Sequence, residues 1–166
     1  MKIRSKAFQS KKPYKPKPFK IPDGFILVID TREQAPLFTR TKGLISTVDT
    51  LTHGDYSIRG FESVFAIERK QTSDFFSYIG KERQRTVKKL LQLSQFEWKA
   101  LVIEATYDDL VAPQIYTAIK PEVVRSFFVS LNVRYDIHAY LDRKRENLER
   151  WILDRAIKFY NIKRGL

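Results

Sequence analysis

The sequence predicts one α/β domain in which a mixed β-sheet is flanked by α-helices. Two short apolar runs carry this prediction, because continuous β-branched runs of this length are typical of strands buried on both faces. The first run covers residues 25–29 and ends at Asp30, and the second covers residues 101–103 and ends at Glu104. Apolar residues recur at helical spacing between and after these runs, and such alternation of strands and helices favours an α/β fold.

The first half of the domain is expected to contain a loop, a hairpin and two helices. Residues 31–47 include Gly, Pro and Thr and predict a long loop. Residues 55–70 predict a hairpin whose second strand alternates apolar and polar side chains. The next helix is expected to begin at a Thr72 cap and to end at Gly80. A second helix is expected over residues 82–96.

The second half of the domain is expected to continue with a strand between helices. Thr106 and Asp109 predict a capping box, and Pro121 suits the first turn of a helix. Residues 135–139 predict a short strand, and Asp142 is expected to cap the last helix. The mostly apolar stripe of that helix predicts its core face and consists of Leu148, Trp151, Ile152, Arg155, Ala156 and Phe159.

Positive charge is concentrated at the N-terminus. The chain carries a net charge of +12, and residues 1–20 contain eight Lys/Arg and no Asp/Glu. A tail of this kind is either a solvated arm or a phosphate-binding arm. We therefore expect residues 1–20 to form a tail outside a single folded domain of residues 21–166, and to bind DNA or a protein partner. The tail lysines expected on DNA are Lys11, Lys12, Lys15 and Lys17.

Composition excludes several classes of protein. The sequence has no Cys, which excludes disulfides and thiolate metal sites. It has no apolar run of the roughly 18 residues that a membrane span requires, and no apolar segment of a secretory signal follows the basic N-terminus. We therefore expect an intracellular protein that is neither secreted nor inserted in a membrane.

Asp55, Glu68 and Lys70 form the candidate catalytic set. Side chains alternate between the two faces of a strand, so Glu68 and Lys70 share one face while Arg69 points away. If the hairpin brings residue 55 beside residue 68, two carboxylates approach each other, and they repel unless a cation lies between them. A hard divalent ion such as Mg²⁺ suits these oxygen ligands. A metal and a nearby lysine are what phosphodiester hydrolysis needs, so the set predicts a metal-dependent nuclease.

Further charged residues surround this set in the sequence. Asp30 ends a buried strand, where ligand sites of α/β sheets lie, and Glu33 follows closely. These two are expected to hold a second metal or to orient the first ligands. A basic helix beyond the hairpin is either solvated or in contact with phosphate, and its candidate DNA-binding residues are Arg83, Arg85, Lys88 and Lys89.

Three segments resemble the XPF-type structure-specific endonuclease family of the PD-(D/E)XK group. They are GD at residues 54–55, ERKQTSD at residues 68–74 and IDTRE at residues 29–33. The likeness extends over about residues 25–140. It implies a restriction-endonuclease-like fold and Mg²⁺- or Mn²⁺-dependent cleavage of branched, flapped or junction DNA. By match to the family, Asp55 and Glu68 are metal ligands, Asp30 is a further candidate ligand, and Lys70 is catalytic. The supporting residues are Asp30, Arg32, Glu33, Arg69 and Asp74. Asp74 is expected to anchor Arg69 or Arg32.

Two alternatives remain open at the level of the sequence. One is a catalytically weak DNA-binding or scaffolding member of the same fold, which the intact catalytic set argues against. The other is a nuclease of the same fold with a different target, such as a Holliday-junction resolvase or a restriction-type enzyme. A homodimer is expected in either case, because family nuclease domains pair. The dimer face is expected on the helix near residues 124–131 or on the last helix.

Overall fold

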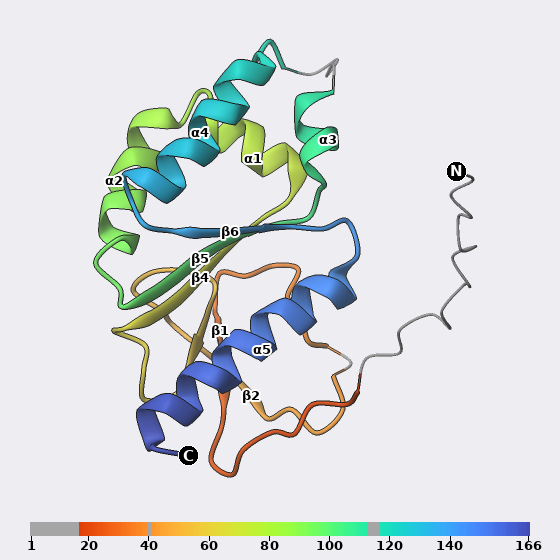
Figure 1. Ribbon diagram of the computed structural model, residues 1–166, viewed down its shortest axis with the longest axis vertical. Coiled ribbons are helices and arrows are strands. Elements are labelled where there is room, and N and C mark those ends of the chain that lie inside the picture. The colour runs from red at the N-terminus through yellow and green to blue at the C-terminus, as the bar shows by residue number, and fades with distance from the viewer. Residues whose placement is uncertain (1–16, 40, 113–116) are drawn as a thin grey trace, which may run out of the picture.

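The computed structural model describes residues 17–39, 41–112 and 117–166. These residues form three layers, in which one six-stranded sheet lies between helices on both of its faces (Figure 1). The α/β prediction with a mixed sheet is therefore confirmed. No helix in the described part of the chain is long and apolar enough to cross a bilayer.

The sheet has the strand order β2-β1-β3-β4-β5-β6. The strand β3 pairs antiparallel with both β1 and β4, whereas the remaining neighbours are parallel, so the sheet is mixed. The strands are β1 (Leu27–Asp30), β2 (Ser46–Asp49), β3 (Tyr56–Ile58), β4 (Phe65–Lys70), β5 (Trp98–Ile103) and β6 (His138–Leu141).

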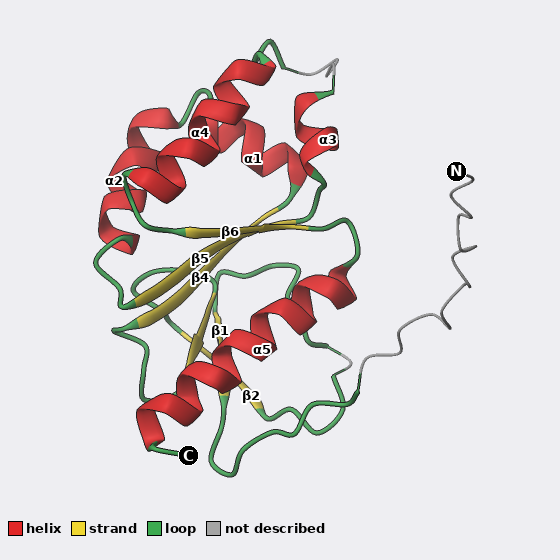
Figure 2. Cartoon of the chain, in the orientation of Figure 1, coloured by secondary structure: helices red, strands yellow, loops and turns green. Residues whose placement is uncertain are grey.

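The helices divide unequally between the two faces of the sheet. Figure 2 shows one long helix, α5, on one face and the other helices together on the opposite face. The helices are α1 (Thr72–Ile79), α2 (Arg83–Leu93), α3 (Tyr107–Val111), α4 (Pro121–Val133) and α5 (Arg145–Arg164). The predicted apolar stripe of α5 is confirmed at Leu148, Ile152 and Ala156, which are fully buried against the sheet.

Alternation along β4 decides which residues face which layer. Phe65 and Ile67 belong to the core beneath α5, whereas Ala66 belongs to the core beneath α1, α2 and α4. The next residues continue this pattern, so Arg69 faces the α5 layer while Glu68 and Lys70 face α1 and α2. The pleat of β4 therefore decides which side chains of the candidate site lie on each face of the sheet.

The strand β2 was not expected, because residues 31–47 predict a loop and residues 46–49 carry no apolar alternation. Three of its four residues are exposed, since it is an edge strand that pairs only with β1. Its position depends on backbone pairing with a buried neighbour, which hydrophobic patterning does not report. The strand predicted over residues 135–139 begins and ends later in the structure, as β6, His138–Leu141. Ile137, just before it, is already buried in the core.

The expected helix caps are corrected at two places. Gln71 is the N-cap of α1, and Thr72 is its first helical residue, whose hydroxyl donates instead to the Glu104 carbonyl at 3.3 Å. The last helix begins at Arg145 with Lys144 as its N-cap, and Asp142 accepts the Lys144 amide just before it. The capping box before α3, with Thr106 and Asp109, is present as predicted. The helix expected over residues 82–96 is shorter and ends at Leu93.

Candidate active site

Asp55 lies directly before β3, and its position depends on the glycine that precedes it. Gly54 has φ +79°, and a Cβ at this position would lie 2.9 Å from the Ile67 carbonyl oxygen, so only glycine fits. The Asp55 amide donates to the same carbonyl at 2.7 Å. Because Tyr56 pairs with Ile67 across an antiparallel ladder, Asp55 comes opposite Glu68. The predicted approach of the two carboxylates therefore follows from the register.

Glu68 is held by two lysines from different elements. Its side chain is only 2% exposed, and its Oε1 atom accepts from Lys70 Nζ at 2.5 Å and from Lys89 Nζ of α2 at 2.6 Å. Burial alone would raise the pKa of Glu68, but the two ammonium groups outweigh it and hold the pKa below its usual range. The same carboxylate raises the pKa of Lys70 against the effect of burial. Glu68 is thus an ionised carboxylate with cations on one oxygen.

The pKa of Asp55 is shifted in the opposite direction to that of Glu68. Burial and the negative charge of Glu68 raise the pKa of Asp55 to about 7, although its Oδ2 accepts the Arg69 amide at 2.6 Å. Two carboxylates that share a site without a cation between them repel, so one of them retains its proton. The pair therefore favours binding of positive charge beside Asp55.

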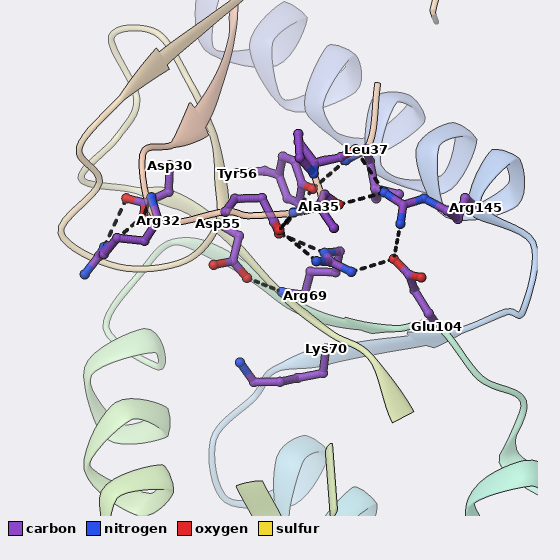
Figure 3. Close-up of polar contacts among 12 residues, drawn as sticks. Asp30, Arg32, Ala35, Leu37, Asp55, Tyr56, Arg69, Lys70, Glu104 and Arg145 are labelled. Carbon is purple, nitrogen blue, oxygen red and sulfur yellow. Dashed lines mark hydrogen bonds and ion pairs between the residues drawn. The ribbon is translucent and has the colours of Figure 1, made fainter. Parts of the chain in front are cut away.

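Asp30 and Arg32 form a separate ion pair at the end of β1. Both Asp30 oxygens accept from the Arg32 guanidinium, at 2.7 and 3.0 Å (Figure 3). The Leu51 amide also donates to Asp30 Oδ2, at 2.7 Å. Burial would raise the pKa of Asp30, but these hydrogen bonds hold it below its usual range. The carboxylate of Asp30 thus already has its hydrogen-bond partners, whereas the side chain of Arg32 is 66% exposed.

Arg69 joins the site to the α5 layer through carboxylates on both sides. Its guanidinium binds both oxygens of Glu33, at 2.7 and 2.8 Å, and Glu104 at 2.6 Å (Figure 3). Arg145, the first residue of α5, reaches the same Glu104 oxygen at 3.2 Å and donates to the Ala35 carbonyl at 2.7 Å. Arg69 points away from Lys70 as predicted. Asp74 was expected to anchor Arg69 or Arg32, but both guanidinium groups lie on other carboxylates.

A hollow of about 370 Å³ opens over this cluster. We call it the carboxylate hollow. Most of the predicted site residues line it, while Asp30 lies behind Arg32 and is not among its lining residues. The predicted residues that line it are Arg32, Glu33, Asp55, Glu68, Arg69, Lys70, Asp74 and Lys89.

The predicted DNA-binding residues of α2 separate by helix face. Lys89 and Arg85 line a second hollow, which also contains Lys70 and Asp74 and adjoins the carboxylate hollow. We call it the lysine hollow. Arg83 turns toward α4, and Lys88 is exposed. Lys17 lies by α5, where its carbonyl accepts from Arg150 at 3.0 Å, and the predicted residues Lys11, Lys12 and Lys15 are outside the described residues.

The donor set of the site fits a hard cation. No group of three or more His, Asp or Glu side chains is arranged as a finished metal site within residues 17–39, 41–112 and 117–166. The observation that supports a cation is the placement of the two carboxylates, because Asp55 comes opposite Glu68 in the strand register and both side chains line one hollow. Two carboxylates offer only oxygen ligands, which Mg²⁺ and Mn²⁺ prefer. Asp55 and Glu68 are the residues that would hold such an ion.

A match to a family model shows which protein family the chain belongs to. The model of the ERCC4 domain matches residues 29–154, which include every residue of the carboxylate hollow. The chain belongs to the ERCC4 domain family. The resemblance read from residues 29–33, 54–55 and 68–74 is thereby confirmed. A comparison with curated protein sequences finds no match.

Solved structures agree with the ERCC4 assignment at the level of the fold. XPF from Aeropyrum pernix superposes with a TM-score of 0.62 at 18% identity, over 81% of this chain and 61% of that one. XPF from Aeropyrum pernix in complex with DNA gives a TM-score of 0.65 at 16% identity, over 83% of this chain and 66% of that one. This chain therefore spans less than two thirds of either matched chain.

Sequence reasoning missed two features of this ERCC4 site. Tyr78 was assigned to the core, and it is 5% exposed, but Lys70 Nζ also lies 5.0 Å from its ring centroid. A signal was available, because Tyr78 follows Asp74 by one helical turn. The second feature is Arg145, which joins Glu104 from a helix 41 residues later in the chain. No local pattern reports a contact of that kind.

Proposed function

We propose that this ERCC4 domain is a divalent-metal-dependent endonuclease that hydrolyses phosphodiester bonds in branched, flapped or junction DNA. The observation that carries the proposal is the cluster of Asp55, Glu68 and Lys70 in one open hollow. Two carboxylates provide the site for Mg²⁺ or Mn²⁺, and a lysine lies against one of them. The match to XPF in complex with DNA supports DNA as the partner.

In this proposal the acidic residues bind the metal, and the basic residues stabilise negative charge on the phosphate. Asp55 and Glu68 would hold the cation, which when bound would supply positive charge at the scissile phosphate and so favour attack by water. Lys70 is held at the mouth of the hollow by Glu68 and Tyr78, so its ammonium group stabilises the negative charge that develops on the phosphoryl oxygens. Lys89 of α2 shares the Glu68 oxygen and lines the carboxylate hollow, where it offers a second positive charge to a phosphate.

The supporting residues fix the shape of the hollow. Asp30 orients Arg32, and the exposed guanidinium of Arg32 is a phosphate contact beside the catalytic set. Glu33 and Glu104 hold Arg69, which keeps the end of β4 beside the loop that carries Glu33. The pairs of Arg69 with Glu33 and Glu104 are largely buried, so this part of the geometry is formed before DNA arrives.

A cleavage panel tests the function. Linear, flap, fork and four-way DNA substrates of the same sequence are incubated with the protein in Mg²⁺, Mn²⁺, Ca²⁺ or excess EDTA. We expect cleavage of at least one branched substrate in Mg²⁺ or Mn²⁺, little in Ca²⁺, which is a larger and weaker Lewis acid, and none in EDTA. Robust cleavage in EDTA would exclude the mechanism, and cleavage of linear duplex at one sequence would favour a restriction-type enzyme.

Matched variants make the panel specific to the site. Lys70→Ala is expected to abolish cleavage, whereas Lys42→Ala, which removes an exposed lysine of the loop before β2, keeps it. Binding of DNA is expected to survive Lys70→Ala, because most phosphate contacts lie elsewhere. If the protein binds every substrate but cuts none, the chain is a DNA-binding or scaffolding member of the family.

A further inference from the structure

A third hollow lies between α2 and α4, away from the carboxylates. It has a volume of about 290 Å³, which is at the lower end for small-ligand sites. Leu90 and Phe127 give it apolar walls, and two exposed arginines, Arg83 and Arg134, also line it. We call it the α2–α4 hollow. The two arginines outnumber the one carboxylate among the lining residues, Glu122, so the composition suits a flat apolar group that is attached to negative charge.

Tyr78 supplies a second and independent observation at this hollow. The residue is 5% exposed, and its hydroxyl has no hydrogen-bond partner within the described ranges. Buried hydroxyls are nearly always bonded, so an unpartnered one calls for a group that completes it. Tyr78 lines the α2–α4 hollow, and a ligand there would offer such a group.

The α2–α4 hollow is continuous with the candidate active site. Tyr78 and Thr86 line both the α2–α4 hollow and the lysine hollow. Lys70, Asp74 and Lys89 line both the lysine hollow and the carboxylate hollow. The three hollows therefore form one path along α1 and α2, with cationic side chains distributed along its length.

We propose that the α2–α4 hollow receives one base of an unpaired DNA strand. The adjoining phosphates of that strand follow Arg85 and Lys89 toward the carboxylate hollow. The inference rests on the proposed function and names the part of the substrate that the site recognises. The hollow selects an unpaired strand, because a base within a duplex is stacked and paired. Such a base does not reach a side pocket unless it is extruded.

The chemistry of the hollow fits a base better than a purely apolar ligand. Phe127 provides an aromatic surface, and every base has a π-face, so stacking tolerates any sequence. The Tyr78 hydroxyl donates to or accepts from the polar edge of a base. Arg83 and Arg134 offer positive charge to the phosphates that accompany it, which a neutral apolar ligand lacks, and Arg134 also lies over the Tyr135 ring at 5.5 Å from its centroid.

A space-filling variant tests the inference without changing the core. Ser126 is an exposed residue of α4 that lines the hollow, so Ser126→Trp fills it. Leu91 is an exposed residue of α2, the other helix beside the hollow, and is not among the lining residues, so Leu91→Trp is the matched control. Affinity is measured by fluorescence anisotropy in Ca²⁺, with flap DNA, with the same flap made abasic at one position at a time, and with linear duplex.

The expected result is a loss of affinity that depends on a base. Ser126→Trp should weaken binding of the flap about tenfold, in line with one stacked base, and should leave duplex binding unchanged. One abasic position should weaken the wild type equally and should have no further effect in Ser126→Trp. Equal affinities for the two Trp variants, or equal losses with flap and duplex, overturn the inference. A changed molar mass in Ser126→Trp with unchanged DNA affinity also overturns it, because the hollow would then be covered by a second copy.

Tyr78→Phe provides the second variant. It removes a hydroxyl that has no partner in the free protein, so its melting temperature should not fall. It should nevertheless reduce the difference in affinity between intact and abasic flap DNA. An unchanged difference overturns the role of the hydroxyl. All of these measurements read binding, so they remain informative if the cleavage panel shows no hydrolysis and the proposed function fails.

Discussion

Replacing Asp55 by Asn should stabilise the metal-free protein at high pH. The folded protein raises the pKa of Asp55 from 3.8 to about 7, through burial first and the charge of Glu68 second. Between these values the folded state binds more protons than the unfolded chain, so the free energy of unfolding falls as pH rises through that window. The Asn side chain is neutral at every pH and retains an oxygen that accepts the Arg69 amide.

The size of the effect follows from the shift. About three pKa units correspond to about 4 kcal/mol at 1.36 kcal/mol per unit. Asp55 is only half-buried, so solvent screening reduces this, and we expect about 2 kcal/mol. For a chain of this length that corresponds to about 4–8 °C in melting temperature. The wild type should therefore lose this amount relative to Asp55→Asn as the pH rises from about 3.8 to about 7.

Thermal unfolding in EDTA measures the difference between the two proteins as a function of pH. Asp108→Asn, which removes an exposed carboxylate of α3, controls for the loss of one negative charge. Parallel curves for the wild type and Asp55→Asn would refute the argument, because they would mean that Asp55 is ionised in the folded protein throughout. Addition of Mg²⁺ at high pH should reverse the order of stability, since only the wild type retains both carboxylates.

The remaining predictions concern metal, tail and assembly. Glu68→Gln should lose Mg²⁺ affinity in calorimetry, whereas Lys70→Ala should retain it or bind more tightly because a cation leaves Glu68, and the reverse pattern would mean that the roles are misassigned. Deletion of residues 1–20 should weaken DNA binding and lower the log–log salt slope by about 0.9 for each phosphate of duplex DNA that the tail neutralises, so an unchanged slope would assign the tail to another partner. Light scattering at high concentration should give the mass of a homodimer, and a monomer mass would count against the family's mode of pairing.

The grouping of Asp55, Glu68 and Lys70 in one place could be predicted because it depends on local geometry. The alternation of β4 alone places Glu68 and Lys70 together and Arg69 opposite them. The approach of Asp55 required one further assumption, a hairpin, which the turn residues between the strands support. The buried strand that ends at Asp30 was also evident from its continuous apolar run. These features depend on residues that are near one another in the sequence.

Features that depend on distant contacts could not be predicted. The basic face of α2 was evident, but only the packing of Leu90 and Leu93 on the sheet decides that Lys89 reaches Glu68. The partner of Glu33 is 36 residues away in Arg69, and charge pairs of that separation leave no periodic signal. An exposed edge strand such as β2 likewise lacks the apolar pattern by which strands are detected.

The three side chains of residues 68–70 make contacts on both faces of the sheet. Glu68 and Lys70 face the hollows over α1 and α2, while Arg69 ties the same strand to Glu33, Glu104 and the start of α5. A buried guanidinium without its carboxylates would carry a large desolvation cost, so the three charges hold one another in one geometry. Because successive residues of one strand cannot move independently, any displacement of Arg69 also displaces the carboxylate and the lysine beside it. Arg69 therefore fixes the position of Glu68 and Lys70, although it lies on the other side of the strand from Lys70.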